Sequence, residues 1–169
     1  MTSENATLGS PSHTRRRITI ERNYQAPIQD VWNLWTTKEG IESWWGPDGF
    51  SVKVRRLDVR PGGELHYDMT ATAPPQVEFM KKAGISLTTQ ARIRYAEVTV
   101  HRRLVYTQLA DFVPEVSPYD VSTTVELHRS GQSVRMVLTF DAMHNEEWTQ
   151  MAISGREGEL GKLDKVLAR

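Results

Sequence analysis

Two charged residues near the C-terminus, Arg156 and Glu159, have the types and spacing that could bind an anion. They fall on a predicted helix whose apolar face is marked by Trp148, Gly155 and Val166. At about 100° per residue, Glu159 is predicted near the centre of that face and Arg156 at its flank, close enough to pair. The planar guanidinium could then bind a ligand carboxylate or enolate, held in place by Glu159. Alternatively, Arg156 extends along the rim and keeps its charge in water.

No other residues form a recognisable catalytic or metal-binding set. The five histidines include no i, i+4 pair and no HExxH motif, and the serines lie in no GxSxG motif. The absence of cysteine excludes disulfides, thiolate nucleophiles and cysteine-bound zinc or iron–sulfur clusters. His144, near the start of the last predicted helix, is the one candidate acid–base group. The sequence therefore predicts no metal and no cofactor, and it gives catalysis no support without excluding it.

The charge and hydropathy of the chain argue against several classes of partner. Its 169 residues include 21 Lys and Arg against 21 Asp and Glu, so the formal net charge is zero. This balance argues against binding to nucleic acid or to an anionic membrane surface. The mean hydropathy is −0.50, and no apolar run reaches the ~18 residues of a membrane span. Because no apolar segment typical of a secretory signal follows the N-terminus, the expected location is the cytoplasm.

The elements that must position these residues follow from the spacing of apolar side chains. Residues 1–13 are rich in Ser, Thr, Asn and Gly, which predicts a disordered tail before a single domain at 14–169. The apolar pattern of the strand at 50–59 changes phase, so a β-bulge is expected at Arg55 and Arg56. Alternating polar and apolar residues predict strands at 17–22, 50–59, 65–69, 91–98, 104–109, 121–127 and 134–140.

Three helices are predicted. Two short ones follow the first strand, starting at Pro27 and at 36–39, and the longest begins after Asn145, a residue suited to a helix N-cap. The segment 71–88 is expected to hold a short helical turn that covers an opening like a lid. The fold class is therefore α+β, with a curved antiparallel sheet of about seven strands wrapped around the long C-terminal helix. Such an arrangement is expected to leave a cavity between sheet and helix.

The inward positions of these elements supply the candidate ligand-binding residues. Tyrosine and methionine are frequent among them, and this mixture suits an apolar pocket with a few polar groups. The alternative is an ordinary core. Trp44 and Trp45 are adjacent, so only one of them is expected to point inward. The predicted binding residues are Trp44, Tyr67, Met69, Phe79, Tyr95, Met136, Phe140, Trp148, Met151, Arg156 and Glu159.

Several motifs, taken in order along the chain, resemble one family. They are Ala26-Pro27 through Val31-Trp32, WWGP at 44–47, DVRPGG at 58–63, RLVYT at 103–107 and GREGELGKLDKVL at 155–167. The chain is similar to the heat shock protein 90 ATPase activator homologues (C-terminal-domain-like), in the START-like or SRPBCC superfamily of polyketide cyclases and birch-allergen-like proteins. The resemblance implies a helix-grip fold with a central hydrophobic cavity. The chain departs from the family where Arg156 replaces the usual aromatic residue after Gly155, and in the insertion 74–88.

The resemblance and the inward residues together favour one function over two others. The favoured function is binding of a small apolar or aromatic ligand in the cavity between the sheet and the C-terminal helix. One alternative, implied by the family, is a co-chaperone or stress-response module with a chaperone partner. The other is a polyketide cyclase-like enzyme, for which cavity shape and general acid groups would suffice. A homodimer is compatible with each, because the sequence does not fix the oligomeric state.

Overall fold

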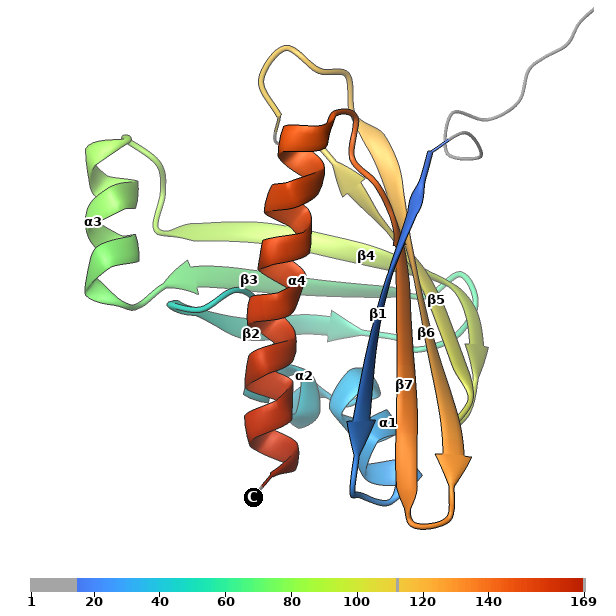
Figure 1. The fold of residues 1–169 in the computed structure, drawn as a ribbon. Coiled ribbons are helices and arrows are strands. Elements are labelled where there is room, and N and C mark those ends of the chain that lie inside the picture. Colours follow the sequence, from blue (N-terminus) through green and yellow to red (C-terminus); the bar gives the residue numbers. More distant parts are fainter. Residues whose placement is uncertain (1–14, 112, 169) are drawn as a thin grey trace, which may run out of the picture.

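The computed structural model describes residues 15–111 and 113–168, and the tail expected at 1–13 lies outside them. Within these residues the chain forms one seven-stranded sheet and four helices (Figure 1). The strands are β1 (Arg17–Tyr24), β2 (Phe50–Leu57), β3 (Glu64–Ala71), β4 (Thr88–Thr99), β5 (Arg103–Ala110), β6 (Tyr119–Ser130) and β7 (Ser133–Asp141). The helices are α1 (Ile28–Thr36), α2 (Lys38–Trp44), α3 (Pro74–Lys82) and α4 (Glu146–Leu167).

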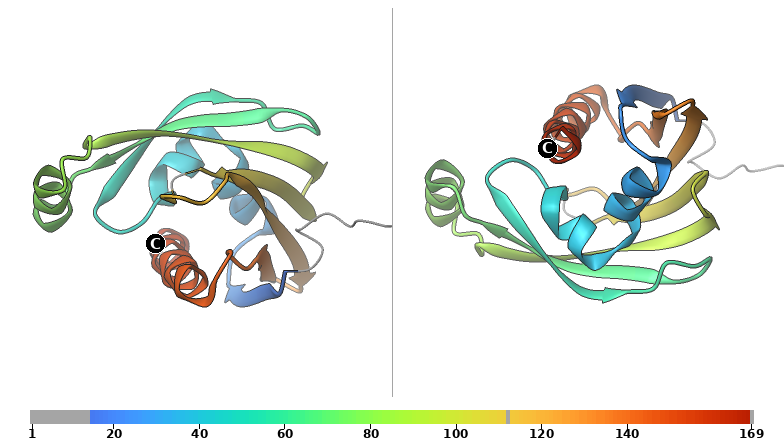
Figure 2. Two further views of the ribbon diagram at one scale, coloured as in Figure 1. Left: turned by 90° about the horizontal axis from the view of Figure 1, so that it is seen from above. Right: turned by 90° about the horizontal axis from the view of Figure 1, so that it is seen from below.

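The sheet is antiparallel throughout, in the order β1-β7-β6-β5-β4-β3-β2. Strands β2 to β7 follow one another as a meander. β1 is the exception, because α1 and α2 separate it from β2 and it pairs with β7 instead, with Ile18 opposite Phe140. The sheet curves around α4, which lies on its concave side (Figure 2). This arrangement confirms the predicted α+β helix-grip fold.

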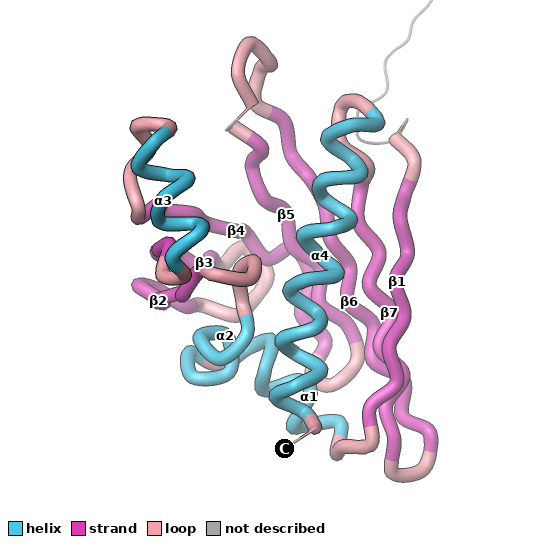
Figure 3. The backbone as a smooth tube through the Cα atoms, turned by 60° about the vertical axis from the view of Figure 1, so that its left-hand side comes forward, coloured by secondary structure: helices cyan, strands magenta, loops and turns pink. Residues whose placement is uncertain are grey.

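Helices α1 and α2 close one end of the concave side, next to the C-terminal part of α4 (Figure 3). The apolar residues of α1 recur at i, i+3, i+4 and i+7, so one face of the helix is buried, including Val31 and Trp35. At the start of α2, the hydroxyl of Thr37 accepts a hydrogen bond from the backbone N–H of Gly40 at 3.0 Å. The side chain of Asn145 caps α4 in the same way, as predicted.

The structure corrects the expectation for the adjacent tryptophans. Both are buried, with Trp44 2% and Trp45 6% exposed. α2 ends at Trp44, and Trp45 has an extended backbone (φ −65, ψ 148), so the two indoles do not follow one helical face. Trp44 and Trp45 both pack edge-on against Trp35, and Trp45 also contacts the rings of Tyr67 and Tyr106. Trp45 is therefore the tryptophan that belongs to the interior beneath α4.

At the edge of the sheet, the local sequence patterns predicted one feature correctly and another only in part. The register of β2 against β3 shifts between Val54 and Arg56, which confirms the predicted bulge. The segment 71–88 contains a nine-residue helix, α3, and not merely a short turn. No described residue of α3 is buried, and Phe79 is 66% exposed. The helix stands at the edge of the sheet, apart from α4 in every view (Figures 1 and 2).

Candidate functional site

The inner face of α4 carries a charged residue at its centre. The residues of α4 that are buried are Thr149, Leu160 and Leu163. Arg156 lies seven residues after Thr149 and four before Leu160, and this spacing places all of them on one face of the helix. An arginine therefore occupies a position where a sheet-covering helix would normally present an apolar side chain.

This placement corrects the predicted geometry of the helix. The prediction put the inward face one residue earlier, on Trp148 and Gly155, because the large apolar Trp148 was expected to point inward. Trp148 is only half-buried, and the fully buried neighbour is Thr149. Consequently Arg156, and not Glu159, lies at the centre of the face.

The guanidinium of Arg156 reaches across the concave side to three strands. One terminal nitrogen donates to the hydroxyl of Tyr106 on β5 at 3.0 Å, and the other donates to Oγ1 of Thr123 on β6 at 2.7 Å. The carbon between them lies 5.1 Å from the centre of the Phe140 ring on β7. All three partners are neutral, and no carboxylate of the described residues lies within 4.0 Å of the guanidinium. The rim alternative is therefore wrong, since the charged end points into the grip.

Glu159 binds the backbone and does not pair with Arg156. Its Oε2 accepts a hydrogen bond from the N–H of Gly46 at 2.9 Å, while Nζ of Lys162 donates to the carbonyl of Gly46 at 2.8 Å. Two side chains of α4 thus hold the N–H and the carbonyl of the same glycine, which has a positive φ of 89°. The predicted ion pair is absent from the described residues because the acid has this nearer partner. The two contacts explain why the WWGP segment lies against α4.

Burial and neighbouring charges shift the pKa values of the ionisable side chains around Glu159. Burial raises the pKa of Glu159 above its usual value, although Arg156, a backbone N–H and Lys162 oppose the rise. Burial lowers the pKa of Lys162, and the charge of Glu159 opposes that change. Burial also opposes the charge of Arg156, but Tyr106 and Glu159 favour it and the pKa is raised. Burial raises the pKa of Tyr67 to about 12.

Replacing Glu159 by glutamine is expected to stabilise the protein at neutral and alkaline pH and to change little in acid. Because folding raises the pKa of this carboxyl, its contribution is fully present below the unfolded-state pKa and is lost as pH rises through the folded-state pKa. Glutamine resembles the protonated acid and can still accept the N–H of Gly46. Urea unfolding across a pH series measures the effect. The control is Glu157→Gln on the exposed side of α4, which removes an ion pair with Arg22 and should therefore not stabilise the protein at neutral pH. An equal pH response in both variants would contradict the prediction.

The structure brings some of the predicted binding residues together and separates others. Tyr67, Tyr95, Met136 and Phe140 are buried, and Met69 and Trp148 are half-buried. Phe79 and Met151 are 66% and 55% exposed, on α3 and on the outer part of α4. Trp44 is buried, but it packs against α1.

Sequence reasoning missed four residues near Arg156 or Glu159, namely Trp45, Tyr106, Thr123 and Lys162. The sequence did indicate one of them. Tyr106 lies two residues after the buried Leu104 in β5, and side chains two residues apart in a strand point to the same face of the sheet. The hydroxyl of Tyr95, whose ring packs edge-on against Tyr106, is buried without a hydrogen-bond partner among the described residues. The interior under α4 therefore contains more polar groups than the sequence suggested.

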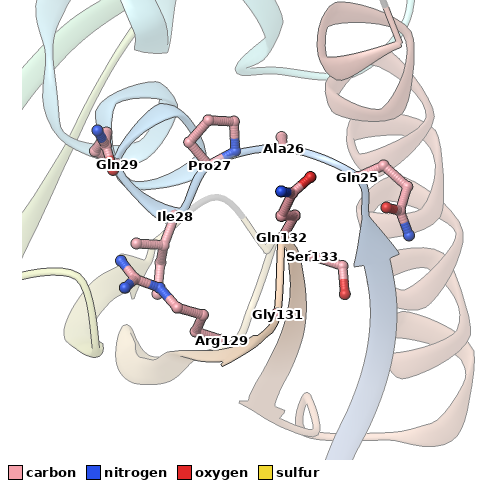
Figure 4. Close-up of a pocket in the computed structure, with 9 residues that line it drawn as sticks. All are labelled: Gln25, Ala26, Pro27, Ile28, Gln29, Arg129, Gly131, Gln132 and Ser133. Carbon is pink, nitrogen blue, oxygen red and sulfur yellow. The ribbon is translucent and has the colours of Figure 1, made fainter.

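Two surface pockets of about 440 Å³ each lie away from Arg156. The first is formed by residues 25–29 and the β6–β7 hairpin, with Gln132 and Arg129 at its edge (Figure 4). The second lies beside α1 and the end of α4, next to Val166 and Leu167. Neither contains a predicted binding residue. These pockets are thus a competing location against which any binding experiment must be controlled.

In the part of the chain that the structure describes, no three His, Asp or Glu side chains are grouped so that they could hold a metal ion. Among the described helices, none combines the length and the apolar character that crossing a bilayer requires.

Comparisons with known proteins agree with the fold. The family model for Activator of Hsp90 ATPase homolog 1-like protein matches residues 25–168. A crystal structure from Chromobacterium violaceum has a TM-score of 0.73 at 21% identity, over 90% of this chain and 97% of the other. A solution structure from Arthrobacter aurescens gives 0.71 at 19% identity, over 96% and 91%. The AHSA1 protein from Silicibacter pomeroyi gives 0.70 at 16% identity, over 90% and 98%. No curated protein matches the sequence.

Proposed function

The chain belongs to the family of Activator of Hsp90 ATPase homolog 1-like proteins, and on that premise we propose that it binds a small hydrophobic or aromatic molecule between the sheet and α4. The fold that it shares with the solved structures commonly encloses hydrophobic ligands. Catalysis has no comparable support, because no nucleophile, base and orienting group are grouped among the described residues.

The position of Arg156 is the observation that carries the proposal. It lies on the buried face of α4 and is surrounded by aromatic rings, yet it remains half-buried, as does Glu159. A helix that only sealed a core would be expected to close this position with an aliphatic side chain. Apolar walls with a few convergent polar groups are instead typical of small-molecule sites.

The proposal is tested by placing a bulky side chain next to Arg156. Ala152 precedes Arg156 by one helical turn and is half-buried, so Ala152→Trp places a large ring beside the guanidinium. The probes are 2-naphthoate and 2-naphthamide, added to the whole protein and followed by thermal shift and by native mass spectrometry. At about 100 times Kd, the wild type is expected to gain roughly 2.7 kcal/mol of stability. Ala152→Trp is expected to remove that gain.

Gln132→Trp is the matched control, because it places the same ring in the pocket of Figure 4. It is expected to leave binding of both probes unchanged. If Gln132→Trp blocks binding and Ala152→Trp does not, the ligand lies in the surface pocket and the proposal is wrong. If neither probe binds the wild type, the proposal is also wrong. Circular dichroism of both variants confirms that the loss of binding is not a loss of fold.

A further inference from the structure

The interior under α4 holds hydrogen-bond donors in excess of acceptors. The hydroxyls of Tyr106 and Thr123 each accept a hydrogen bond from Arg156, so each keeps its own proton to donate. Neither hydroxyl donates to an acceptor among the described residues. The buried hydroxyl of Tyr95 also lacks a partner there. Two of these hydroxyls bind a guanidinium that only neutral groups contact, and the third belongs to a ring that packs against Tyr106.

The neighbouring carboxylate does not correct this imbalance. Oε2 of Glu159 is directed to the backbone of Gly46, and Lys162 lies on the same side of the helix. A buried cation is costly unless an acceptor of opposite charge pairs with it. A planar guanidinium offers two parallel N–H groups, which match the two oxygens of a carboxylate. The missing component of the cluster is therefore an anion with acceptor oxygens.

We propose that the ligand is an apolar or aromatic carboxylate, and that its charged end is bound by Arg156 with the hydroxyls of Tyr106 and Thr123 as further donors. This inference rests on the proposed function and specifies the ligand class for the same site. The apolar body of the ligand would lie against Trp45 and Phe140, the rings nearest to Tyr106 and to the guanidinium.

Binding of an anion to Arg156 is coupled to protonation of Glu159. The groups that face Glu159 are Arg156 and Lys162 on α4, Asp48 near Lys162, and Tyr67 on β3. An anion on the guanidinium offsets the charge of Arg156, which is the charge that most favours the ionised form of Glu159. The ligand therefore makes Glu159 easier to protonate, and a carboxylate should bind more weakly as pH rises and Glu159 ionises.

The first test compares 2-naphthoate with its neutral amide by isothermal titration calorimetry. The wild type is expected to bind the acid at least about tenfold more tightly than the amide. Arg156→Met is expected to lower the affinity for the acid by about 30-fold or more, which is the usual effect of breaking a desolvated charge pair. It is expected to leave the affinity for the amide within about threefold of the wild type. Arg156→Lys keeps the positive charge but not the two parallel N–H groups, and it is expected to give an intermediate loss of affinity for the acid. Retained amide binding shows that the variants are folded.

The second test uses Glu159→Gln, which removes the neighbouring negative charge. This variant is expected to bind 2-naphthoate about tenfold more tightly at neutral pH and to lose the pH dependence seen in the wild type. Titrations in buffers of different ionisation enthalpy should show proton uptake with the acid in the wild type and none in Glu159→Gln. If both probes bind the wild type equally, or if Arg156→Met weakens both alike, the anion assignment is wrong while the proposed function stands. If neither probe binds, both are wrong.

Discussion

Replacing Gly40 by alanine is expected to destabilise the protein by roughly 3 kcal/mol or more, whereas the same replacement at Gly161 should stabilise it by about 1 kcal/mol. A Cβ atom at Gly40 would lie 2.3 Å from the carbonyl oxygen of Asn33 and 2.7 Å from Cα of Leu34. Both atoms belong to the backbone of α1, so neither can turn away as a side chain would. The two short helices would have to separate, and the indole N–H of Trp44 would lose its 2.7 Å hydrogen bond to Leu34.

Gly161 is in the opposite situation. It lies inside α4, and a Cβ atom there would have no atom within 4 Å beyond its chain neighbours and the adjacent backbone of its own helix. Alanine then contributes only its lower conformational entropy in the unfolded chain and its better helix propensity. Urea and thermal unfolding of both variants measure the difference. Gly158→Ala has equally open surroundings and should match Gly161→Ala, so a loss of stability in either variant of α4 would show that this face is covered.

The second large effect is expected at Leu163, where alanine should cost about 2–5 kcal/mol. The side chain is completely buried, and it is one of three buried side chains among the described residues of α4. A helix attached through so few apolar side chains depends strongly on each of them. Val166→Ala, at a partly buried position on the same helix, is the matched control and should cost about 1 kcal/mol.

Hydrogen exchange shows whether Leu163→Ala destabilises α4 alone or the whole protein. If α4 detaches as a unit, Leu163→Ala should speed exchange in α4 and at Gly46, while the amides of β5 and β6 stay protected. Uniform acceleration across the sheet would show instead that α4 and the sheet unfold together. A cost below about 1 kcal/mol would contradict the view that these few contacts hold the helix.

The sheet could be predicted from the sequence because its signals are local. Alternation of apolar residues gave the strands, and the phase change at Arg55 gave the bulge that the register of β2 confirms. The adjacent tryptophans show the limit of this reasoning. Trp44 and Trp45 are both buried because a helix ends between them, and the direction of the second side chain depends on that change of backbone conformation.

The site was predicted less completely because its partners are distant in the sequence. Arg156 and Glu159 were identified, but the prediction put Glu159 at the centre of the inward face of the helix, where the structure has Arg156. Which face of α4 turns inward depends on what the sheet offers opposite it, namely the hydroxyls of Tyr106 and Thr123. Helical periodicity describes the apolar residues of one segment, and it does not register a polar residue that is satisfied by another strand.

The pairing of β1 with β7 has a consequence for how the protein is made. β1 leaves the ribosome early, but its hydrogen-bonding partner is the last strand of the meander, and α4, which also contacts β1, follows that strand. The hairpins from β2 to β7 can form in turn, while β1 must wait with Ile18 and Ile20 uncovered. Closing such a non-local pair is slow, and an unpaired strand is prone to associate with other chains. The nascent protein is therefore most vulnerable to aggregation during synthesis of β7 and α4, the interval in which a holding chaperone would protect it most.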